Sequence, residues 1–150
     1  MIEDFSDRER WIWLACFIDT DGTITISYTR FPYYYPTIIL SGSKQGLLEE
    51  AMAGFDRGIW HERELRKSGV KAVKFFGRHI RPMLVSLLPF LILKKQQAKL
   101  CIEYLDYLNQ KEVKASGVKR ELDDYEKELI TKVRKLNATQ TGKWHKPRFE

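Results

Sequence analysis

The sequence predicts an α+β domain that contains a four-stranded antiparallel sheet. Two observations support this fold class: two pairs of strand-like segments, and helix-like segments before, between and after those pairs. The chain has 150 residues, of which 43% are apolar and 31% are charged. That length is enough to bury one core and too short for two ordinary domains. We therefore expect one domain over residues 1–150, with residues 131–150 as a basic C-terminal tail.

The first predicted helix has clear start and stop signals. Ser6 and Glu9 have the spacing of a capping box, just before the apolar run at residues 11–18. That run is apolar on almost every side, so we expect the helix to be covered on more than one side. Gly22 follows an acidic turn and suits the end of a helix.

The next segment changes from a helical period to a period of two. Ile24 and Ile26 alternate with threonine and serine, which predicts a strand with one apolar and one hydroxyl face. A loop with two prolines and three tyrosines is expected at residues 30–36, and a second strand at about 37–41. A turn and a helix over 45–55 follow, with its apolar residues on one side.

The second half of the chain predicts a hairpin and three helices. Strands at residues 59–65 and 70–76 flank a turn at 66–69. The helices are expected at about residues 82–88, 94–109 and 120–136, so the full order is αββαββααα. One face of the sheet should pack on helices, while the other face is polar.

The net charge of +6 is concentrated in two parts of the chain. Residues 57–99 carry a net +9 and residues 131–150 a net +5, whereas the other segments are mildly acidic. Basic surfaces of this kind indicate a polyanionic partner, most often nucleic acid, although a solvated charged face has the same pattern.

Several other classes of protein are not indicated. No apolar run is long enough for a membrane helix and no signal peptide pattern precedes the first helix, so we expect an intracellular protein without a membrane partner. Cys16 and Cys101 are expected as free thiols, and the three histidines show no zinc spacing.

The stretch LACFIDTDG at residues 14–22 resembles the signature of the LAGLIDADG homing endonucleases. It matches at six positions, which are Leu14, Ala15, Ile18, Asp19, Asp21 and Gly22. The segment PFLILKKQQA at residues 89–98 and the LNAT at 136–139 are similar to the single-motif, homodimeric, intron-encoded branch of this family. The predicted order of elements also resembles the αββαββα core of the family, with extra C-terminal helices.

The resemblance implies a site-specific endonuclease. It would act as a homodimer on double-stranded DNA, cut a long pseudo-palindromic site, and use Mg²⁺, with Mn²⁺ as a substitute and no small-molecule cofactor. One alternative is a catalytically silent nucleic-acid-binding protein of the same fold, such as an RNA maturase or a DNA-binding regulator. A basic α+β protein that binds another protein is a further alternative. Asp21 and Lys94 favour the endonuclease, because a pure binder needs no carboxylate that faces phosphate.

The resemblance also implies roles for individual residues. Asp21 and the backbone carbonyl of Thr20 would hold the metal, and Lys94 would stabilise developing charge, whereas Asp19 is expected to be structural. In the turn after the second strand the sequence departs from the family. Alignment from the strand side places Ser43 at a water-positioning position, alignment from the helix side places Lys44 at a basic position, and a shortened turn is compatible with both.

A single motif implies that the first helix pairs with the same helix of a second copy. Cys16 replaces a glycine of the family, which should widen or shift the helix pair. The residues expected in this interface are Trp11, Leu14, Ala15, Cys16 and Ile18.

The DNA contacts are expected on the polar sheet face and in the C-terminal region. Candidates for base contacts are Thr23, Thr25, Ser27, Thr29, His61, Arg63 and Lys74, with Ile38 and Leu40 against thymine methyl groups. Candidates for phosphate contacts are Lys67, Lys71, Asn137, Thr139, Gln140 and Lys143.

Overall fold

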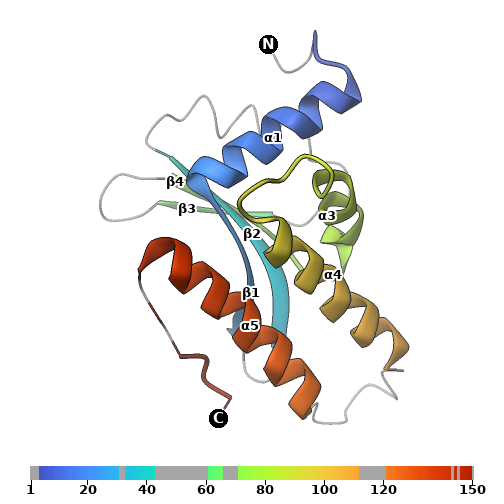
Figure 1. The fold of residues 1–150 in the computed structure, drawn as a ribbon, viewed down its shortest axis with the longest axis vertical. Coiled ribbons are helices and arrows are strands. Elements are labelled where there is room, and N and C mark those ends of the chain that lie inside the picture. Colours follow the sequence, from blue (N-terminus) through green and yellow to red (C-terminus); the bar gives the residue numbers. More distant parts are fainter. Residues whose placement is uncertain are drawn as a thin grey trace.

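The computed structural model places four strands in one antiparallel sheet and packs four helices on one face of it (Figure 1). It describes residues 4–30, 33–42, 61–65, 71–111, 121–142, 144 and 146–149. The strand order is β1-β2-β4-β3, with bounds β1 Gly22–Arg30, β2 Tyr33–Gly42, β3 His61–Leu65 and β4 Lys71–Phe76. The helices are α1 Asp7–Asp21, α3 Arg81–Leu87, α4 Lys95–Gln110 and α5 Asp124–Thr141, with a 3₁₀ turn at Arg78–Ile80.

This architecture confirms the predicted α+β class and the order of the described elements. The helix expected over 45–55 lies outside the described residues. None of the described helices is both long and apolar enough to cross a lipid bilayer.

Helix α1 begins where the capping box predicts. The Ser6 N–H donates to the Glu9 carboxylate at 2.7 Å, and the Glu9 N–H donates to the Ser6 hydroxyl. These two hydrogen bonds therefore satisfy two backbone N–H groups that have no partner within the first turn of the helix.

The apolar residues of α1 divide between an inner and an outer side. Leu14, Ala15 and Ile18 have no exposed surface and face the sheet and α3. Their prediction as dimer contacts is wrong, because these side chains fill the chain's own core. Trp11 is half-buried and packs against the same core, whereas Cys16 is exposed. A helix that is apolar all round gives no sequence signal for which side turns inward.

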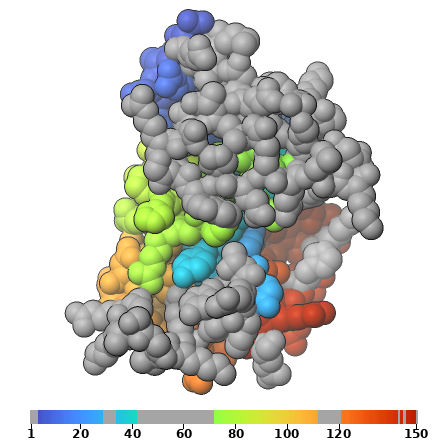
Figure 2. All heavy atoms as spheres, turned by 180° about the vertical axis from the view of Figure 1, so that it is seen from behind, coloured from blue at the N-terminus to red at the C-terminus, as the bar shows by residue number. Residues whose placement is uncertain are grey.

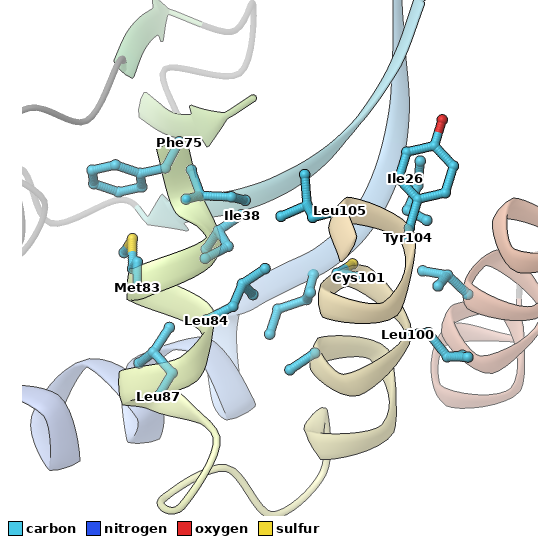
Figure 3. Packing of buried hydrophobic residues seen from close by; sticks show 14 of the residues in the cluster. Ile26, Ile38, Phe75, Met83, Leu84, Leu87, Leu100, Cys101, Tyr104 and Leu105 are labelled. Atoms are coloured by element: carbon cyan, nitrogen blue, oxygen red, sulfur yellow. The ribbon is translucent and has the colours of Figure 1, made fainter. Parts of the chain in front are cut away.

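The core lies between the sheet and the helices, where Leu84 of α3 and Leu105 of α4 meet the strands (Figure 3). Ile24 and Ile26 have no exposed surface, which confirms the apolar face predicted for the first strand. The strand residues that point into this layer are Ile24, Ile26, Ile38, Leu40, Val73 and Phe75.

The prediction of Ile38 and Leu40 as DNA contacts is wrong. Both side chains are fully buried on the helix side of β2. Ile39 lies on the opposite face, in register with Thr23 of β1 and Lys74 of β4. Because successive strand residues alternate between faces, an error of one position exchanges the core side for the DNA side.

Strand β2 begins earlier than predicted, within the tyrosine-rich segment that was expected to be a loop. Pro36 is tolerated there because of its position in the sheet. Its carbonyl accepts a hydrogen bond from the Gly77 N–H at 3.2 Å, just beyond the last β2–β4 pair, Thr37 with Phe76. The backbone N–H and C=O of one strand residue point toward the same neighbouring strand. The N–H that Pro36 lacks would therefore point past the end of β4.

The register of the β3–β4 hairpin separates three residues that were expected on one polar face. His61 pairs with Phe75 and Arg63 pairs with Val73, the two residues of β4 that are buried in the core. Lys74 belongs to the alternate row. The assumption that His61, Arg63 and Lys74 share one row of the polar face is therefore wrong.

Helix α5 is fixed at its start by a second capping box, between Asp123 and Glu126. The Lys111 ammonium bonds to both carboxylates, at 2.7 Å and 3.1 Å. Partial burial alone would raise the pKa of Asp123, but hydrogen bonds from Lys111, Tyr107 and the Glu126 N–H hold it down at about 2. The helix begins later than predicted and runs to Thr141, where Gly142 ends it at a φ of 71°.

Gly22 is the point at which α1 turns into β1. Its N–H donates to the Ile18 carbonyl, and a Cβ there would lie 2.8 Å from the Ile18 Cα and 3.1 Å from the Ile39 carbonyl oxygen. Backbone atoms on both sides leave no room for a side chain, which explains the last glycine of the motif.

We predict that Gly22→Ala lowers the free energy of unfolding by about 2 kcal/mol, because the backbone must move to admit the Cβ. Urea denaturation measures this change. Gly22→Asn should be at least as harmful, whereas Gly142→Asn should be nearly neutral, since open space surrounds Gly142 and asparagine tolerates positive φ. A Gly22→Ala protein as stable as wild type would contradict this account.

Candidate active site

The motif ends at the junction between α1 and β1, where Asp21 is the last residue of the helix. Asp21 is exposed, and its carboxylate has no hydrogen bond or ion pair with the part of the chain that the structure describes. Its backbone carbonyl accepts a hydrogen bond from the Ser41 hydroxyl at 3.4 Å. The backbone at this position is therefore tied to the end of β2 while the carboxylate points to solvent.

Thr20 presents a carbonyl oxygen at the same helix end. Its hydroxyl donates to the carbonyls of Cys16 at 3.0 Å and Phe17 at 3.2 Å, so the side chain is engaged with its own helix. No hydrogen bond to the Thr20 carbonyl is found among the described residues. Two oxygen atoms of this chain, the Asp21 carboxylate and the Thr20 carbonyl, are thus available to a hard cation.

Asp19 has a different role from Asp21. Its two carboxylate oxygens accept hydrogen bonds from the backbone N–H groups of Ile92, at 2.7 Å, and Lys94, at 3.0 Å. This contact confirms that Asp19 is structural, and it fastens the loop that precedes α4 to the end of α1. A carboxylate used twice in this way has little capacity left for a metal ion.

Lys94 closes the C-terminal end of α1. Its ammonium donates to the carbonyls of Ile18, at 2.6 Å, and Asp19, at 3.0 Å, and the residue is only 8% exposed. Burial lowers the pKa of the ammonium, while the charges of Asp19 and Asp21 oppose that shift. A cation in this position meets the negative end of the helix dipole. Its expected part in stabilising charge during cleavage stays a prediction.

Ser43 and Lys44 lie outside the described residues, so their catalytic roles stay predictions. Ser41, two positions earlier, was not predicted. It is the described residue of this turn region that bonds to the motif. A serine at the end of a strand carries no sequence signal for such a contact, because the partner is 20 residues away.

Two predicted phosphate contacts, Asn137 and Gln140, make hydrogen bonds within the chain. The Asn137 amide donates to the Ile24 carbonyl at 3.0 Å and accepts from the buried Gln97 side chain at 3.2 Å. Asn137 therefore joins α5, α4 and β1, and because it is only half-buried its part as a DNA contact stays a prediction. The Gln140 amide nitrogen donates to the Leu93 carbonyl at 2.7 Å, although the residue is exposed.

The polar sheet face keeps several of the predicted DNA contacts. Thr23, Thr25 and Ser27 are half-exposed on the side of β1 that faces away from the helices, and Lys74 is half-exposed on β4. Seen from behind, atoms of β1 and β2 reach the surface (Figure 2). Thr139 is exposed at the end of α5. The remaining candidates lie outside the described side chains, and they are Thr29, His61, Arg63, Lys67, Lys71 and Lys143.

The residues present fit a divalent metal only in part. The described residues contain no cluster of three or more His, Cys, Asp or Glu side chains that could hold an ion. One carboxylate and one carbonyl per chain are a sufficient protein share for Mg²⁺, which keeps several waters and often takes the remaining ligands from phosphate oxygens.

No family model matches this sequence, and the curated proteins contain no match. Solved structures do match it. The homing endonuclease I-CvuI, in complex with its target, has a TM-score of 0.61 and 21% identity over 91% of this chain and 82% of that chain. The archaeal intron-encoded homing endonuclease I-Vdi141I, complexed with DNA, has a TM-score of 0.59 and 14% identity over 97% and 90% of the two chains.

The chain has the LAGLIDADG homing-endonuclease fold. The LAGLIDADG meganuclease I-AabMI, bound to uncleaved DNA, matches with a TM-score of 0.60 and 17% identity over 87% of this chain, but over only 44% of its own length. The present chain thus corresponds to most of I-CvuI and to about half of I-AabMI. In this fold the signature residues take the positions described above, with Asp21 at the helix end and Gly22 against β2.

We predict that the two aspartates of the LAGLIDADG motif separate stability from function. Asp19→Ala should lower the free energy of unfolding by about 2 kcal/mol, because two backbone donors lose a charged acceptor. Asp21→Asn should change it by less than about 0.5 kcal/mol, because the exposed carboxylate makes no described hydrogen bond or ion pair and only adds to the charge felt by Lys94. Urea denaturation of both variants measures the difference, and equal losses of stability would refute this division.

Proposed function

We propose that this protein is a LAGLIDADG homing endonuclease that acts as a homodimer and hydrolyses both strands of DNA at a long, pseudo-palindromic site. The single observation that carries the proposal is the Asp21 carboxylate. It is exposed and without a described partner at a helix end that is otherwise held by Lys94, Asp19 and Ser41. A fold that rigidly presents an unpaired carboxylate beside a polar sheet face suits cleavage better than binding alone.

The chemistry follows from the oxygen atoms at this helix end. The Asp21 carboxylate and the Thr20 carbonyl would hold Mg²⁺, or Mn²⁺ in its place, together with DNA oxygens and water. A divalent ion held there would supply positive charge against the phosphate and would lower the pKa of bound water. Lys94 and Asp19 keep the helix end in place, and the hydroxyl groups of Thr23 and Thr25 lie on the adjacent sheet face, where DNA bases would be contacted.

The homodimer is supported by the outer side of α1. Ile12 is 42% exposed, and Cys16 and Thr20 are exposed one and two turns further along the helix. Trp13 and Phe17 are half-buried, with ring centroids 5.7 Å apart. An apolar helix side of this kind, repeated by a two-fold axis, would bring two copies of Asp21 near each other.

The surface next to this helix side is also apolar. Ile92 and Leu93 are 83% and 61% exposed in the loop that Asp19 fastens to α1. The half-length match to I-AabMI further supports an assembly of two copies.

The nuclease activity can be tested without a known target. We predict that the protein linearises some members of a plasmid library with random inserts in Mg²⁺ and none in Ca²⁺. Asp21→Asn should lower the cleavage rate by more than about 100-fold, since residues that merely support a metal ligand already account for 10–100-fold. Asp124→Asn, which removes an exposed carboxylate from the start of α5, is the matched control.

The outcome separates the endonuclease from the alternative function. Linear products that require Mg²⁺ and Asp21 support cleavage by this site. Sequence-specific binding without cleavage in Mg²⁺ or Mn²⁺ would replace the proposal with a nucleic-acid-binding protein of the same fold.

The dimer can be tested through its two cysteines. Cys16 is exposed on the outer side of α1, whereas Cys101 is fully buried and burial raises the pKa of its thiol. We predict that a short bis-maleimide yields a covalent dimer through Cys16 and that Cys16→Ser abolishes it. Ile12→Asp should shift the protein to a monomer in sedimentation, because it places a charge in the contact. A monomeric wild type at micromolar concentration, with no cross-linked product, would contradict the dimer.

A further inference from the structure

The C-terminal segment returns to the far end of the sheet and is fixed there by several contacts. The buried Tyr34 hydroxyl donates to the Arg148 carbonyl, and the Phe149 ring lies 5.9 Å from the Tyr34 ring, measured between centroids. Pro147 is buried, and the Lys127 ammonium lies 5.8 Å from the centroid of Phe149. The return of the chain brings Lys146 and Arg148 beside α5.

A pocket of about 310 Å³ lies at this place. Its lining consists of Tyr28, Tyr34, Arg134, Lys146 and Arg148. Three cations and two phenol rings therefore share one cavity, and none of the described lining residues carries a carboxylate. No ion pair involves any of the three cations within the described residues, so their mutual repulsion is not offset by a described acid.

Arg134 adds an independent observation. Its Nε is buried and has no hydrogen-bond partner among the described residues. The nearby Tyr34 phenol has a raised pKa because it is buried, and the positive charge of Arg134 opposes that shift. A buried guanidinium nitrogen without an acceptor is costly, and an anion in the pocket would supply the acceptor.

This pocket is separate from the face expected to bind DNA. Tyr28 belongs to the same side of β1 as Ile24 and Ile26, which is the side that the helices cover. It also lies six residues along the strand from Gly22, so about 20 Å separates it from the candidate active site. Figure 1 shows the C-terminus beside α5, at the end of β1 that is distant from α1.

We propose that this pocket is a phosphate-binding site. Arginine binds phosphate oxygens in a bidentate manner, lysine adds a point charge, and tyrosine can donate through its hydroxyl. Tyr28 is 53% exposed, so the cavity is open to solvent and could admit a phosphate that is part of a larger molecule. The phosphate has one of two sources. It belongs to a free phosphorylated compound, or it belongs to the backbone of bound DNA, at a nucleotide outside the stretch that lies on the polar sheet face.

Calorimetric titration of the full chain with inorganic phosphate and with pyrophosphate, at low ionic strength, tests the site directly. We expect saturable binding with one site per chain. Arg134→Gln and Arg148→Gln should each weaken it by about tenfold or more, as for loss of one charge-assisted contact. Lys135→Gln is the matched control, because it removes the same charge from the adjacent exposed residue of α5 and should change the affinity by less than about twofold.

If Arg134→Gln does not fold, Arg148→Gln still tests the phosphate site. The described contact of Arg148 to Tyr34 uses its backbone carbonyl, which the substitution retains. Circular dichroism and urea denaturation of each variant establish whether it is folded before affinities are compared.

A second arm identifies the source of the phosphate. The affinities for a short duplex, which covers only the polar sheet face, and for a longer duplex are measured in Ca²⁺ over a range of salt concentrations. If the pocket holds a backbone phosphate, Arg134→Gln reduces the slope of log Kd against log salt by about one for the longer duplex only.

Unchanged slopes together with weakened phosphate binding would instead identify a free phosphorylated compound as the ligand. The proposal is overturned if Arg134→Gln and Lys135→Gln behave alike in both arms. Neither arm depends on cleavage, so the result does not depend on whether the protein is a nuclease.

Discussion

The contact between the Lys94 ammonium and the last carbonyls of α1 is the interaction on which the candidate active site depends. A buried ammonium loses hydration that is worth several kcal/mol, and this loss is offset here by two carbonyl oxygens at the negative end of a helix. Lys94 also donates its backbone N–H to Asp19, so one residue joins α1 to the start of α4 twice. The position of Asp21 at the surface is a consequence, because the helix end cannot move without breaking these bonds.

Asp19 and Asp21 are two residues apart but lie on different sides of the end of α1. Their carboxylates therefore have different roles. Asp19 faces the loop before α4, where each of its carboxylate oxygens accepts a hydrogen bond from a backbone N–H, while Asp21 faces solvent. Gly22 then lets the chain pass within contact distance of β2. The buried contacts of Asp19 and Lys94 hold the backbone of this helix end, and the Asp21 carboxylate, which has no described hydrogen bond, is left exposed.

Local features of the fold could be predicted from the sequence, and features set by distant contacts could not. The capping box at Ser6 and the alternation of Ile24 and Ile26 depend on neighbouring residues, and both are confirmed. The inner side of α1 and the orientation of Ile38 depend on what packs against them, so the apolar character of the segment left them undetermined. The motif predicted that Asp21 and Lys94 belong to one site, but the carbonyl partners of Lys94 arise only from the folded geometry.

The distribution of positive charge has a different meaning in three dimensions than along the chain. In the C-terminal region the residues expected to contact DNA phosphates were Asn137, Thr139, Gln140 and Lys143. Three other cations, Arg134, Lys146 and Arg148, lie together on the helix side of β1. Arg134 is held there by helix α5, while the contacts of Tyr34 with Arg148 and Phe149 bring the end of the chain to it. No acid is among the described residues that line the pocket, so their positive charges are not offset there by a described carboxylate.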